Sequence, residues 1–309
     1  MSLLSALFLS SGDPALDRRH EWARGLLERG DVQAAIELLD ETLIRGPRFI
    51  AGWFLLGEAN ELAGNKEAAI TAFRRALKLD PEDRLGAGLR LARLRARKPQ
   101  TMARAMSPAY VRTLFDQYAG RFDRELVEAL HYSGPALIAA ALVKTAGERR
   151  FKRVLDLGCG TGLMGEAIRG RAEQLIGVDL SENMVGAARR KQIYDRLAVA
   201  DLAYFLAAEP ETFDLILAAD VFVYLPDLKP VCAAVAHKLL PDGLFAFTVE
   251  THEGGDAILR DTLRFAHGER HLRDAASAAG MRILLLENVA TRQEQNRPVE
   301  GLLAVLGAS

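Results

Sequence analysis

The chain has 309 residues, half of them hydrophobic, with 40 Lys and Arg against 41 Asp and Glu. This length suits two domains that each bury a core. The balanced charge gives no whole-chain electrostatic reason to bind nucleic acid or an anionic membrane. The two cysteines, Cys159 and Cys232, are too few for a disulfide framework or a thiolate metal site and indicate a reducing cytoplasm.

Residues from about Asp17 to Asp83 repeat with a period of 34 residues, the spacing of paired-helix repeats. In the second copy the packing residues fall at characteristic places, which are Trp53, Leu56, Gly57, Ala69, Phe73, Ala76 and Pro81. With these residues the segment resembles the tetratricopeptide repeats. We therefore expect an all-α repeat domain over residues 1–98, of a kind that can bind peptides along its concave surface.

Two positions depart from the repeat pattern, because Arg19 and Asn60 stand where aromatic residues are expected. Residues 85–98 combine arginines with leucines, which is typical of an amphipathic helix that closes a repeat array. A proline then ends this helix. We interpret residues 99–107 as a linker to a second domain, 108–309.

The second domain begins with an aromatic segment, residues 108–123. Its aromatic side chains are Tyr110, Phe115, Tyr118 and Phe122. In a helix these side chains would not share one face, so some of them must contact a neighbouring surface or a ligand.

A glycine-rich turn follows a predicted buried strand at residues 153–157. Gly158, Gly160 and Gly162 stand at alternate positions, which lets the backbone turn tightly into a helix that begins near Leu163. A ligand can touch bare backbone in such a loop, and the start of the helix favours an anion or a strongly polar group.

Two kinds of cofactor fit this loop. Residues 160–165 match the G-x-G-x-x-G dinucleotide pattern, so a nicotinamide or flavin nucleotide is one alternative. Asp156 favours the other, because a carboxylate two residues before the first glycine repels a pyrophosphate and attracts an ammonium group. S-adenosylmethionine carries such an ammonium group and no phosphate.

With this acid followed by these glycines, the run from Asp156 to Gly162 resembles the first motif of the class I S-adenosylmethionine-dependent methyltransferases. The resemblance implies a Rossmann-like α/β domain of seven strands, the last one antiparallel. It also implies that the aromatic segment folds over the cofactor, with Tyr118 as the preferred covering residue. The loop residues implied to contact the cofactor are Asp156, Gly158, Cys159, Gly160, Thr161 and Gly162.

Two further predicted strands, 174–178 and 197–200, also end in acids. Asp179 can accept both ribose hydroxyls of an adenosine ligand, and Met184 is suited to lie against a flat purine. The family places an acid at the position of Asp201 to accept from the adenine amino group, and a helix cap is the alternative role. The cofactor residues expected at these two strand ends are Asp179, Leu180, Met184, Asp201 and Leu202.

The fourth predicted strand, 213–218, continues into a loop that should face the transferable methyl group, because ligands sit beyond the carboxyl ends of central strands. In this loop we assign Asp220 to the cofactor, Phe222 to the substrate pocket and Tyr224 as the second candidate base. The loop lacks the Asn/Asp-Pro-Pro-aromatic signature of many enzymes that methylate amide or base nitrogens.

The C-terminal region is predicted to contain strands at 244–249, 281–286 and 302–306 and a helix at 272–279. Arg264 and His267 precede that helix and resemble pocket residues of a subgroup of predicted bacterial methyltransferases that carry tetratricopeptide repeats. We assign Arg264 to the substrate and His267 as the first candidate base, with a satisfied surface histidine as the alternative. Residues 292–298 are predicted to form a polar loop, and the His and acid positions show no metal-ligand spacing.

The sequence therefore predicts a cytoplasmic S-adenosylmethionine-dependent methyltransferase that acts by direct displacement on an unidentified small-molecule or protein- or carrier-bound acceptor. The repeats would bind the substrate or a partner protein, or pair two chains as a homodimer. One alternative is a non-catalytic scaffold whose α/β domain only holds a nucleotide-like ligand, and another is a Rossmann oxidoreductase. No metal, nucleic acid or membrane is expected as a partner.

Overall fold

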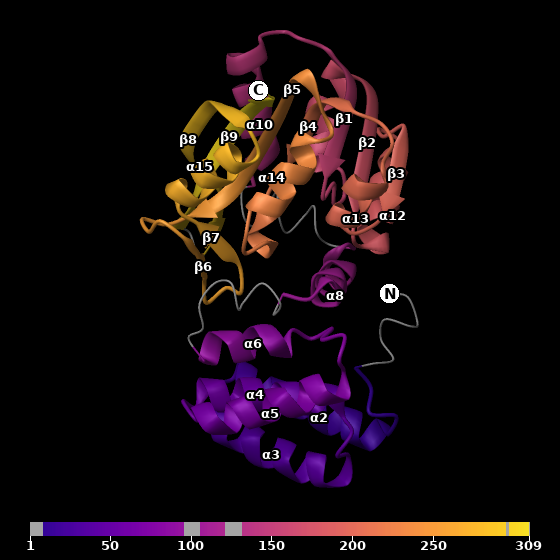
Figure 1. Cartoon of the computed structure of the whole chain (residues 1–309). Helices are drawn as coiled ribbons and strands as arrows, with labels where there is room; N and C mark the ends of the chain where they lie inside the picture. The colour runs from indigo at the N-terminus through magenta and orange to yellow at the C-terminus, as the bar shows by residue number, and fades with distance from the viewer. Residues whose placement is uncertain (1–8, 96–105, 121–131, 295–296, 309) are drawn as a thin grey trace. The chain divides into compact units, whose positions relative to one another are not determined.

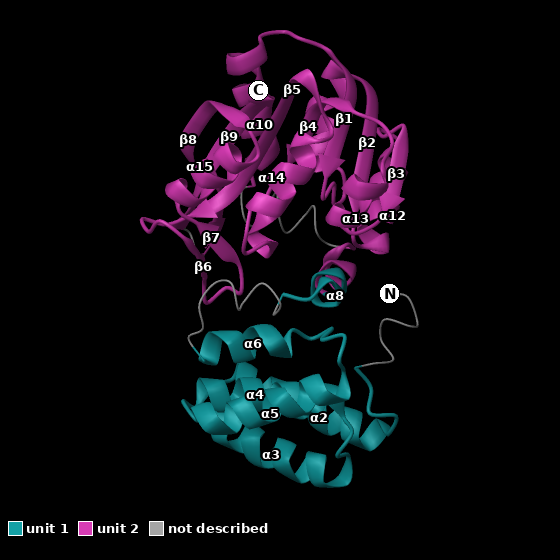
Figure 2. Ribbon diagram, in the orientation of Figure 1, with its two compact units in different colours: residues 1–113 teal, residues 114–309 magenta. Residues whose placement is uncertain are grey.

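The computed structural model describes residues 9–95, 106–120, 132–294 and 297–308. The chain divides into two compact units, Met1–Thr113 and Leu114–Ser309 (Figures 1 and 2). The predicted linker at residues 99–107 lies largely outside the described residues, so the domain boundaries stay a prediction.

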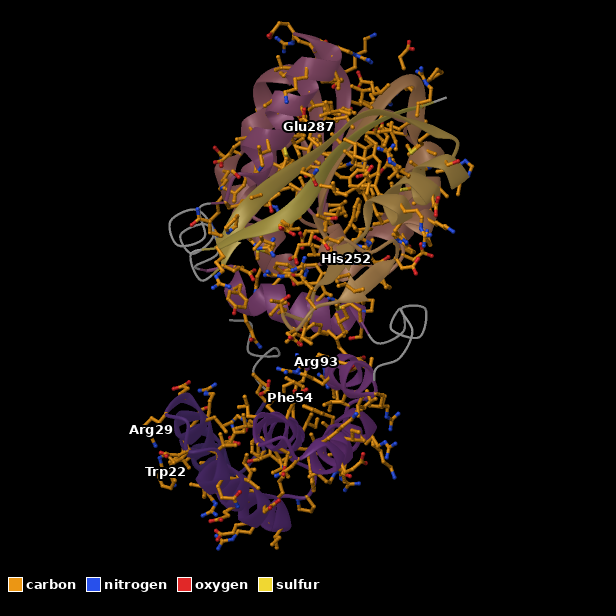
Figure 3. All side chains as sticks on the ribbon, turned by 90° about the vertical axis from the view of Figure 1, so that its left-hand side faces the viewer. Trp22, Arg29, Phe54, Arg93, His252 and Glu287 are labelled. Carbon is orange, nitrogen blue, oxygen red and sulfur yellow. The ribbon has the colours of Figure 1, made fainter. Side chains whose placement is uncertain are left out.

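The first unit is built from antiparallel helix pairs, which confirms the predicted all-α repeat region. Its helices are α2 (Pro14–Glu28), α3 (Val32–Arg45), α4 (Ile50–Leu62), α5 (Lys66–Leu79) and α6 (Ala87–Leu94). Each helix packs against the next one along the chain. Phe54 of α4, labelled in Figure 3, lies in this unit. Its ring packs edge-on against that of Phe73 of α5, with ring centroids 5.4 Å apart.

The packing between these helices explains both the matches and the departures of the repeat pattern. A Cβ at Gly57 would lie 2.5 Å from the buried ring of Phe73, so the glycine leaves room for that ring. Asn60 is buried, and its amide donates to the main-chain oxygen one turn earlier at 2.9 Å. Arg19 donates to the hydroxyl of Thr42 at 2.9 Å. Where aromatic rings were expected, the polar side chains thus have hydrogen-bond acceptors, a main-chain oxygen for Asn60 and the Thr42 hydroxyl for Arg19.

The second unit is an α/β domain, which confirms the predicted fold class. It contains the helices α8 (Pro108–Tyr118, divided between the units), α10 (Gly134–Ala146), α11 (Leu163–Ile168), α12 (Glu182–Lys191), α13 (Leu202–Ala208), α14 (Lys229–Ala236) and α15 (Glu269–Ala278), and the short turns η2 (Arg169–Arg171) and η3 (Phe222–Tyr224). Its strands are β1 (Phe151–Leu157), β2 (Ala172–Asp179), β3 (Arg196–Val199), β4 (Phe213–Ala218), β5 (Leu239–Thr251), β6 (Ala257–Leu259), β7 (Phe265–His267), β8 (Met281–Glu294) and β9 (Arg297–Ala308).

The seven predicted strands form the main sheet, in the spatial order β3, β2, β1, β4, β5, β9, β8 (Figure 1). Strands β1 to β5 run parallel to their neighbours, while β9 pairs antiparallel with β5 and with β8. The carboxyl ends of β1, β2, β3, β4 and β5 therefore meet at one edge, which is where ligands bind in sheets of this kind.

The structure adds a short hairpin that the sequence did not predict. β6 and β7 pair with each other, and β7 runs parallel to the end of β5, with Glu250 opposite Ala266 and Thr251 opposite His267. The predicted loop at residues 292–298 is also wrong in part, because β8 continues to Glu294 and β9 begins at Arg297. Both differences extend the sheet at its carboxyl edge.

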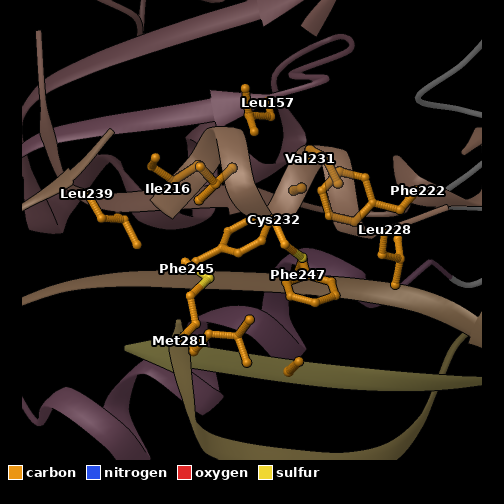
Figure 4. Close-up of a cluster of buried hydrophobic side chains, with 14 of the residues drawn as sticks. Leu157, Ile216, Phe222, Leu228, Val231, Cys232, Leu239, Phe245, Phe247 and Met281 are labelled. Carbon is orange, nitrogen blue, oxygen red and sulfur yellow. The ribbon is translucent and has the colours of Figure 1, made fainter. Parts of the chain in front are cut away.

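Helices cover both faces of the sheet and enclose two apolar clusters. One cluster joins α10 and α11 to one face, and the other joins α13, α14 and α15 to the opposite face. Figure 4 shows the second cluster, with Phe222, Phe245 and Phe247 between α14 and the sheet. Among the described residues, no helix has both the length and the apolar character needed to cross a membrane.

Candidate functional site

The glycine loop lies between β1 and α11, and its three alternate glycines all adopt left-handed backbone conformations. Gly158, Gly160 and Gly162 have φ angles of 66°, 53° and 97°. A Cβ at Gly158 would lie 2.5 Å from a side-chain carbon of Val221, whereas a Cβ at Gly160 would meet nothing within 4 Å. The loop therefore packs against the protein at Gly158 and presents bare backbone to open space at Gly160.

Asp156 lies near the end of β1, two residues before the first glycine of the loop, and is 1% exposed. Its Oδ2 accepts a hydrogen bond from the hydroxyl of Tyr194 at 2.6 Å, while its Oδ1 has no partner among the described residues. Burial raises the pKa of Asp156 to about 7. A buried acceptor without a donor is costly, so this oxygen is suited to a cationic donor supplied by a ligand.

Asp179 ends β2 and ties the loop to the neighbouring strand. Its Oδ2 accepts from the backbone N–H of Gly160 at 2.9 Å, and its Oδ1 accepts from that of Ser181 at 2.8 Å. Burial raises the pKa of the Asp179 carboxyl, against these two hydrogen bonds. The Ser181 hydroxyl caps α12 by accepting from the backbone N–H of Met184. The Met184 side chain is fully buried, and Leu180 is partly exposed. The ribose and purine roles remain predictions.

Asp201 occupies the start of α13 as an exposed helix cap. Its Oδ1 accepts from the backbone N–H groups of Ala203 and Tyr204, at 2.9 and 3.1 Å. This is the structural role that the sequence left open as the alternative. The predicted contacts of Asp201 and Leu202 with adenine remain predictions.

Helix α8 is fastened to this edge of the sheet by its second half. The carboxylate of Asp116 accepts from the Ser181 hydroxyl at 2.5 Å, and its main-chain oxygen accepts from the Asn183 side chain at 3.0 Å. Phe115 packs edge-on against Tyr224, with ring centroids 5.4 Å apart. The segment thus spans from the start of α12 to η3, while Phe122 lies outside the described residues.

Asp220 follows β4 and is held by a polar network. Its backbone has a φ angle of 56°, its Oδ1 accepts from the Thr248 hydroxyl at 2.9 Å, and its Oδ2 accepts from Thr291 at 3.1 Å. Arg292 also donates to Oδ2, at 2.9 Å. Asp220 thus joins β4, β5 and β8, and its cofactor role stays a prediction.

Arg292 lies at the carboxyl edge of the sheet, and its buried position there was not predicted from the sequence. The sequence predicts it within a polar, hairpin-like loop, but its side chain is 4% exposed and pairs with Glu250, Asp220 and Glu294. Burial opposes its charge, yet the carboxylates of Asp220 and Glu250 raise the pKa of Arg292. No local pattern marks its place, because Thr291 and Arg292 are buried one after the other beside an irregularity in the pairing of β8 with β9. Its ion pairs depend on residues far away in the sequence.

Two predicted pocket residues are enclosed. Phe222 is fully buried, and its ring lies 5.3 Å from that of Phe247, so its predicted role in a substrate pocket is at odds with the structure. His267 is fully buried in β7, with Nε2 3.1 Å from the main-chain oxygen of Phe222. Burial lowers the pKa of His267 to about 4. Because a base must reach the proton that it removes, an enclosed imidazole is a poor candidate.

The other two residues predicted to contact the substrate, Tyr224 and Arg264, are partly exposed to solvent. Tyr224 is partly exposed at the end of η3 and remains the candidate base. Arg264, with 27% of its side chain exposed, donates to Glu294 and lies 3.9 Å from Glu250. Its assignment to the substrate remains a prediction.

The structure thus brings Asp156, Asp179, Asp220 and the glycine loop together at the carboxyl ends of β1, β2 and β4. Cys159 and Thr161 of the loop are buried, and Tyr118, at 39% exposure, lies at the end of α8. Among the described residues, no group of three or more His, Cys, Asp or Glu side chains is placed to hold a metal ion.

Comparison with known proteins agrees with this arrangement. The methyltransferase domain family matches residues 155–247, and a tetratricopeptide repeat family matches residues 20–84. A ubiquinone biosynthesis O-methyltransferase of Idiomarina loihiensis is 36% identical over 104 residues, which is 31% of this chain and 42% of that protein. Its counterpart from Bordetella pertussis is 27% identical over 173 residues, 50% of this chain and 70% of that protein.

The fold also matches a solved structure. Magnesium protoporphyrin IX methyltransferase from Synechocystis PCC 6803, solved with bound SAH, superposes with a TM-score of 0.52 at 18% identity over 65% of this chain and 99% of that chain. The chain spans less than half the length of the Idiomarina loihiensis relative, 42%. The two family matches thus place a methyltransferase domain at residues 155–247 of the α/β unit, and tetratricopeptide repeats before it in the chain, at residues 20–84.

Proposed function

We propose that the protein is a cytoplasmic S-adenosylmethionine-dependent methyltransferase. The observation that carries the proposal is the buried Oδ1 of Asp156, which has no hydrogen-bond partner in the described part of the chain and precedes the open backbone of Gly160 in the same loop region. An ammonium group would satisfy this oxygen, whereas a pyrophosphate would be repelled by it. A dinucleotide therefore fits this loop poorly and S-adenosylmethionine fits it well.

Each part of the cofactor is assigned to a different residue at the carboxyl edge of the sheet. Asp156 would hold the amino-acid end, Asp179 the ribose and Met184 the purine, with Asp201 and Asp220 at the outer edge. Because Asp179 also holds the Gly160 N–H at 2.9 Å, the ribose contact and the loop conformation depend on one carboxylate. This coupling makes the site ready for the ligand before it binds.

The bound cofactor would supply a sulfonium methyl group that is electrophilic without help from a metal. The protein then needs mainly to align an acceptor with that methyl group and to exclude water. Tyr224 would contact the acceptor, and its partial exposure at the carboxyl edge, where it packs against Phe115, supports this role. It is the better candidate for removing a proton where the acceptor is a hydroxyl or an amine.

The acceptor is proposed only as a small molecule or a protein- or carrier-bound group. Repeat arrays of stacked helix pairs commonly hold peptides, so the repeats are proposed to recruit the substrate or a partner protein, or to pair two chains. The named O-methyltransferase relatives make an oxygen acceptor the first class to test.

The cofactor assignment is tested by titrating S-adenosylhomocysteine against the wild type and Asp179→Ala. We expect the dissociation constant to rise at least about tenfold, because hydrogen bonds to a charged group each contribute about 1.5–3 kcal/mol. Asp242→Asn is the matched control, since Asp242 is an exposed carboxylate in the first half of β5, away from the carboxyl edge. Equal affinity in Asp179→Ala and the wild type would remove the ribose assignment.

Turnover separates an enzyme from a scaffold. The full-length protein is incubated with cofactor labelled in the methyl group and with cell extract, and label is sought in protein and in small molecules. Transfer that disappears in Asp179→Ala supports the enzyme. Tight cofactor binding without transfer to either fraction would favour the scaffold alternative.

A further inference from the structure

Tyr194 makes a contact that the proposed function does not yet use. It lies between α12 and β3, and its hydroxyl reaches Asp156 on β1 across the neighbouring strand β2. Asp156 stands opposite Gly177 in the pairing of β1 with β2, and a Cβ at Gly177 would lie 2.8 Å from the Tyr194 ring. The glycine thus opens the path along which the ring reaches the carboxylate.

A second glycine accommodates the hydroxyl itself. A Cβ at Gly165 would lie 2.4 Å from the Tyr194 hydroxyl oxygen. Gly165 is the last glycine of the apparent dinucleotide pattern, so the structure gives it a different purpose, which is to admit this tyrosine. Neither glycine has a positive φ angle, so space and not backbone conformation accounts for both.

The backbone on either side of Tyr194 is fixed. Arg169 donates to the main-chain oxygen of Ile193 at 3.1 Å and to the carboxylate of Asp195 at 2.7 Å. The same carboxylate accepts from the backbone N–H of Leu175 at 2.7 Å. The backbone that carries the Tyr194 ring is therefore held on both sides.

We propose that Tyr194 is a positioning residue for the cofactor, whose hydroxyl occupies Oδ2 of Asp156 so that Oδ1 is left for the ammonium group of the amino-acid end. The inference rests on the proposed function, because it requires a ligand that carries this group. The hydroxyl donates to the carboxylate, so it favours the charged form that the ammonium group needs.

The proposal makes cofactor binding depend on pH. Within the described ranges, the titratable groups that act on Asp156 or are acted on by it are Tyr194, Asp179, Cys159 and Tyr132. Burial raises the pKa of Asp156 to about 7, and the Tyr194 hydrogen bond opposes that rise. The free protein must therefore lose a proton from Asp156 to bind the ammonium group, so the affinity falls as the pH drops below about 7.

The test compares S-adenosylhomocysteine with 5′-methylthioadenosine, which has the same adenosine but no ammonium group, by calorimetric titration of the full-length protein. For the wild type, the affinity for S-adenosylhomocysteine should fall roughly 25-fold between pH 7.5 and pH 5.5, and that for 5′-methylthioadenosine should stay level. In Tyr194→Phe, S-adenosylhomocysteine should bind roughly tenfold more weakly at pH 7, and the acid limb should move to higher pH. The affinity for 5′-methylthioadenosine should not change.

Two further variants serve as a second test of the hydroxyl and as a control. Gly165→Ala leaves the tyrosine in place but displaces its hydroxyl, so it should reproduce the effect of Tyr194→Phe if that variant fails to fold. Tyr204→Phe removes a hydroxyl from a tyrosine that is 72% exposed, and it should bind both ligands as the wild type does.

The outcomes separate this inference from the proposed function. If neither ligand binds, the cofactor assignment itself fails. If both ligands bind but the variants weaken them equally, or the acid limb stays where it is in the wild type, Tyr194 only supports the fold and the inference is wrong.

Discussion

At the scale of single residues, a glycine in the loop can be needed for its backbone conformation or for the space that a ligand occupies beside it, and a substitution of Gly160 distinguishes the two. Gly160 has a φ angle of 53°, and a Cβ there would enter open space. Gly160→Ala should therefore cost only about 1–2 kcal/mol of stability, the cost of a left-handed conformation, while the affinity for S-adenosylhomocysteine falls at least tenfold. Chemical denaturation and titration of the same sample measure the two effects.

Gly280 provides the matched control for this prediction. It has a φ angle of 67° and equally open space around its missing Cβ, but it lies between α15 and β8. Gly280→Ala should lose a similar amount of stability and keep the wild-type affinity. A Gly160→Ala variant that binds the ligand as tightly as Gly280→Ala would show that the ligand does not approach this backbone.

At the scale of elements, buried ion pairs join strands that are distant in sequence. Arg292 of β8 pairs with Glu250 of β5 and with Asp220 after β4. Because removing one partner leaves a buried charge uncompensated, Arg292→Met should lower the free energy of unfolding by about 3–5 kcal/mol. Urea denaturation measures this change.

Arg297→Met is the control, because Arg297 is exposed in β9 and the same substitution should stay within about 0.5 kcal/mol of the wild type. A loss below about 1 kcal/mol in Arg292→Met would mean that the carboxylates find water or another donor.

The same elements show what could be predicted from the sequence. Runs of branched apolar residues correctly predicted β1, β2 and β4. A strand that is buried on both faces is apolar along its length, so the sequence alone identifies it without knowledge of the strands beside it. The acids at the ends of β1 and β2 followed from the same pattern. The short β7 was missed because its pairing with the end of β5 depends on residues far away in the chain.

Individual contacts were harder to predict than strands. Tyr194 depends on the space left by Gly165 and Gly177, which belong to α11 and β2, and no local pattern connects the three residues. His267 was expected to reach the substrate because of its resemblance to pocket residues of a methyltransferase subgroup, yet a β-strand buries it. Burial of a single polar side chain is decided by tertiary packing, which a local pattern does not contain.

At the scale of the whole molecule, the two compact units contain separate apolar clusters. The residues of two clusters lie in α2 to α6 and nearby turns of the repeat unit, and those of the other two lie in the α/β unit. Domains with their own cores unfold as separate cooperative units unless a large interface couples them. We therefore expect two calorimetric transitions for the full-length protein.

Ligand binding and a core substitution should each act on one transition. S-adenosylhomocysteine at 100 times its dissociation constant stabilises the unit that binds it by about 2.7 kcal/mol, so it should raise only the transition of the α/β unit. Phe73→Ala empties a fully buried position between α4 and α5, and it should destabilise only the repeat unit, by about 3–5 kcal/mol. A single transition that both changes shift would mean that the repeats and the α/β unit fold as one. The repeats would then stabilise the α/β unit in addition to the recruiting role proposed for them.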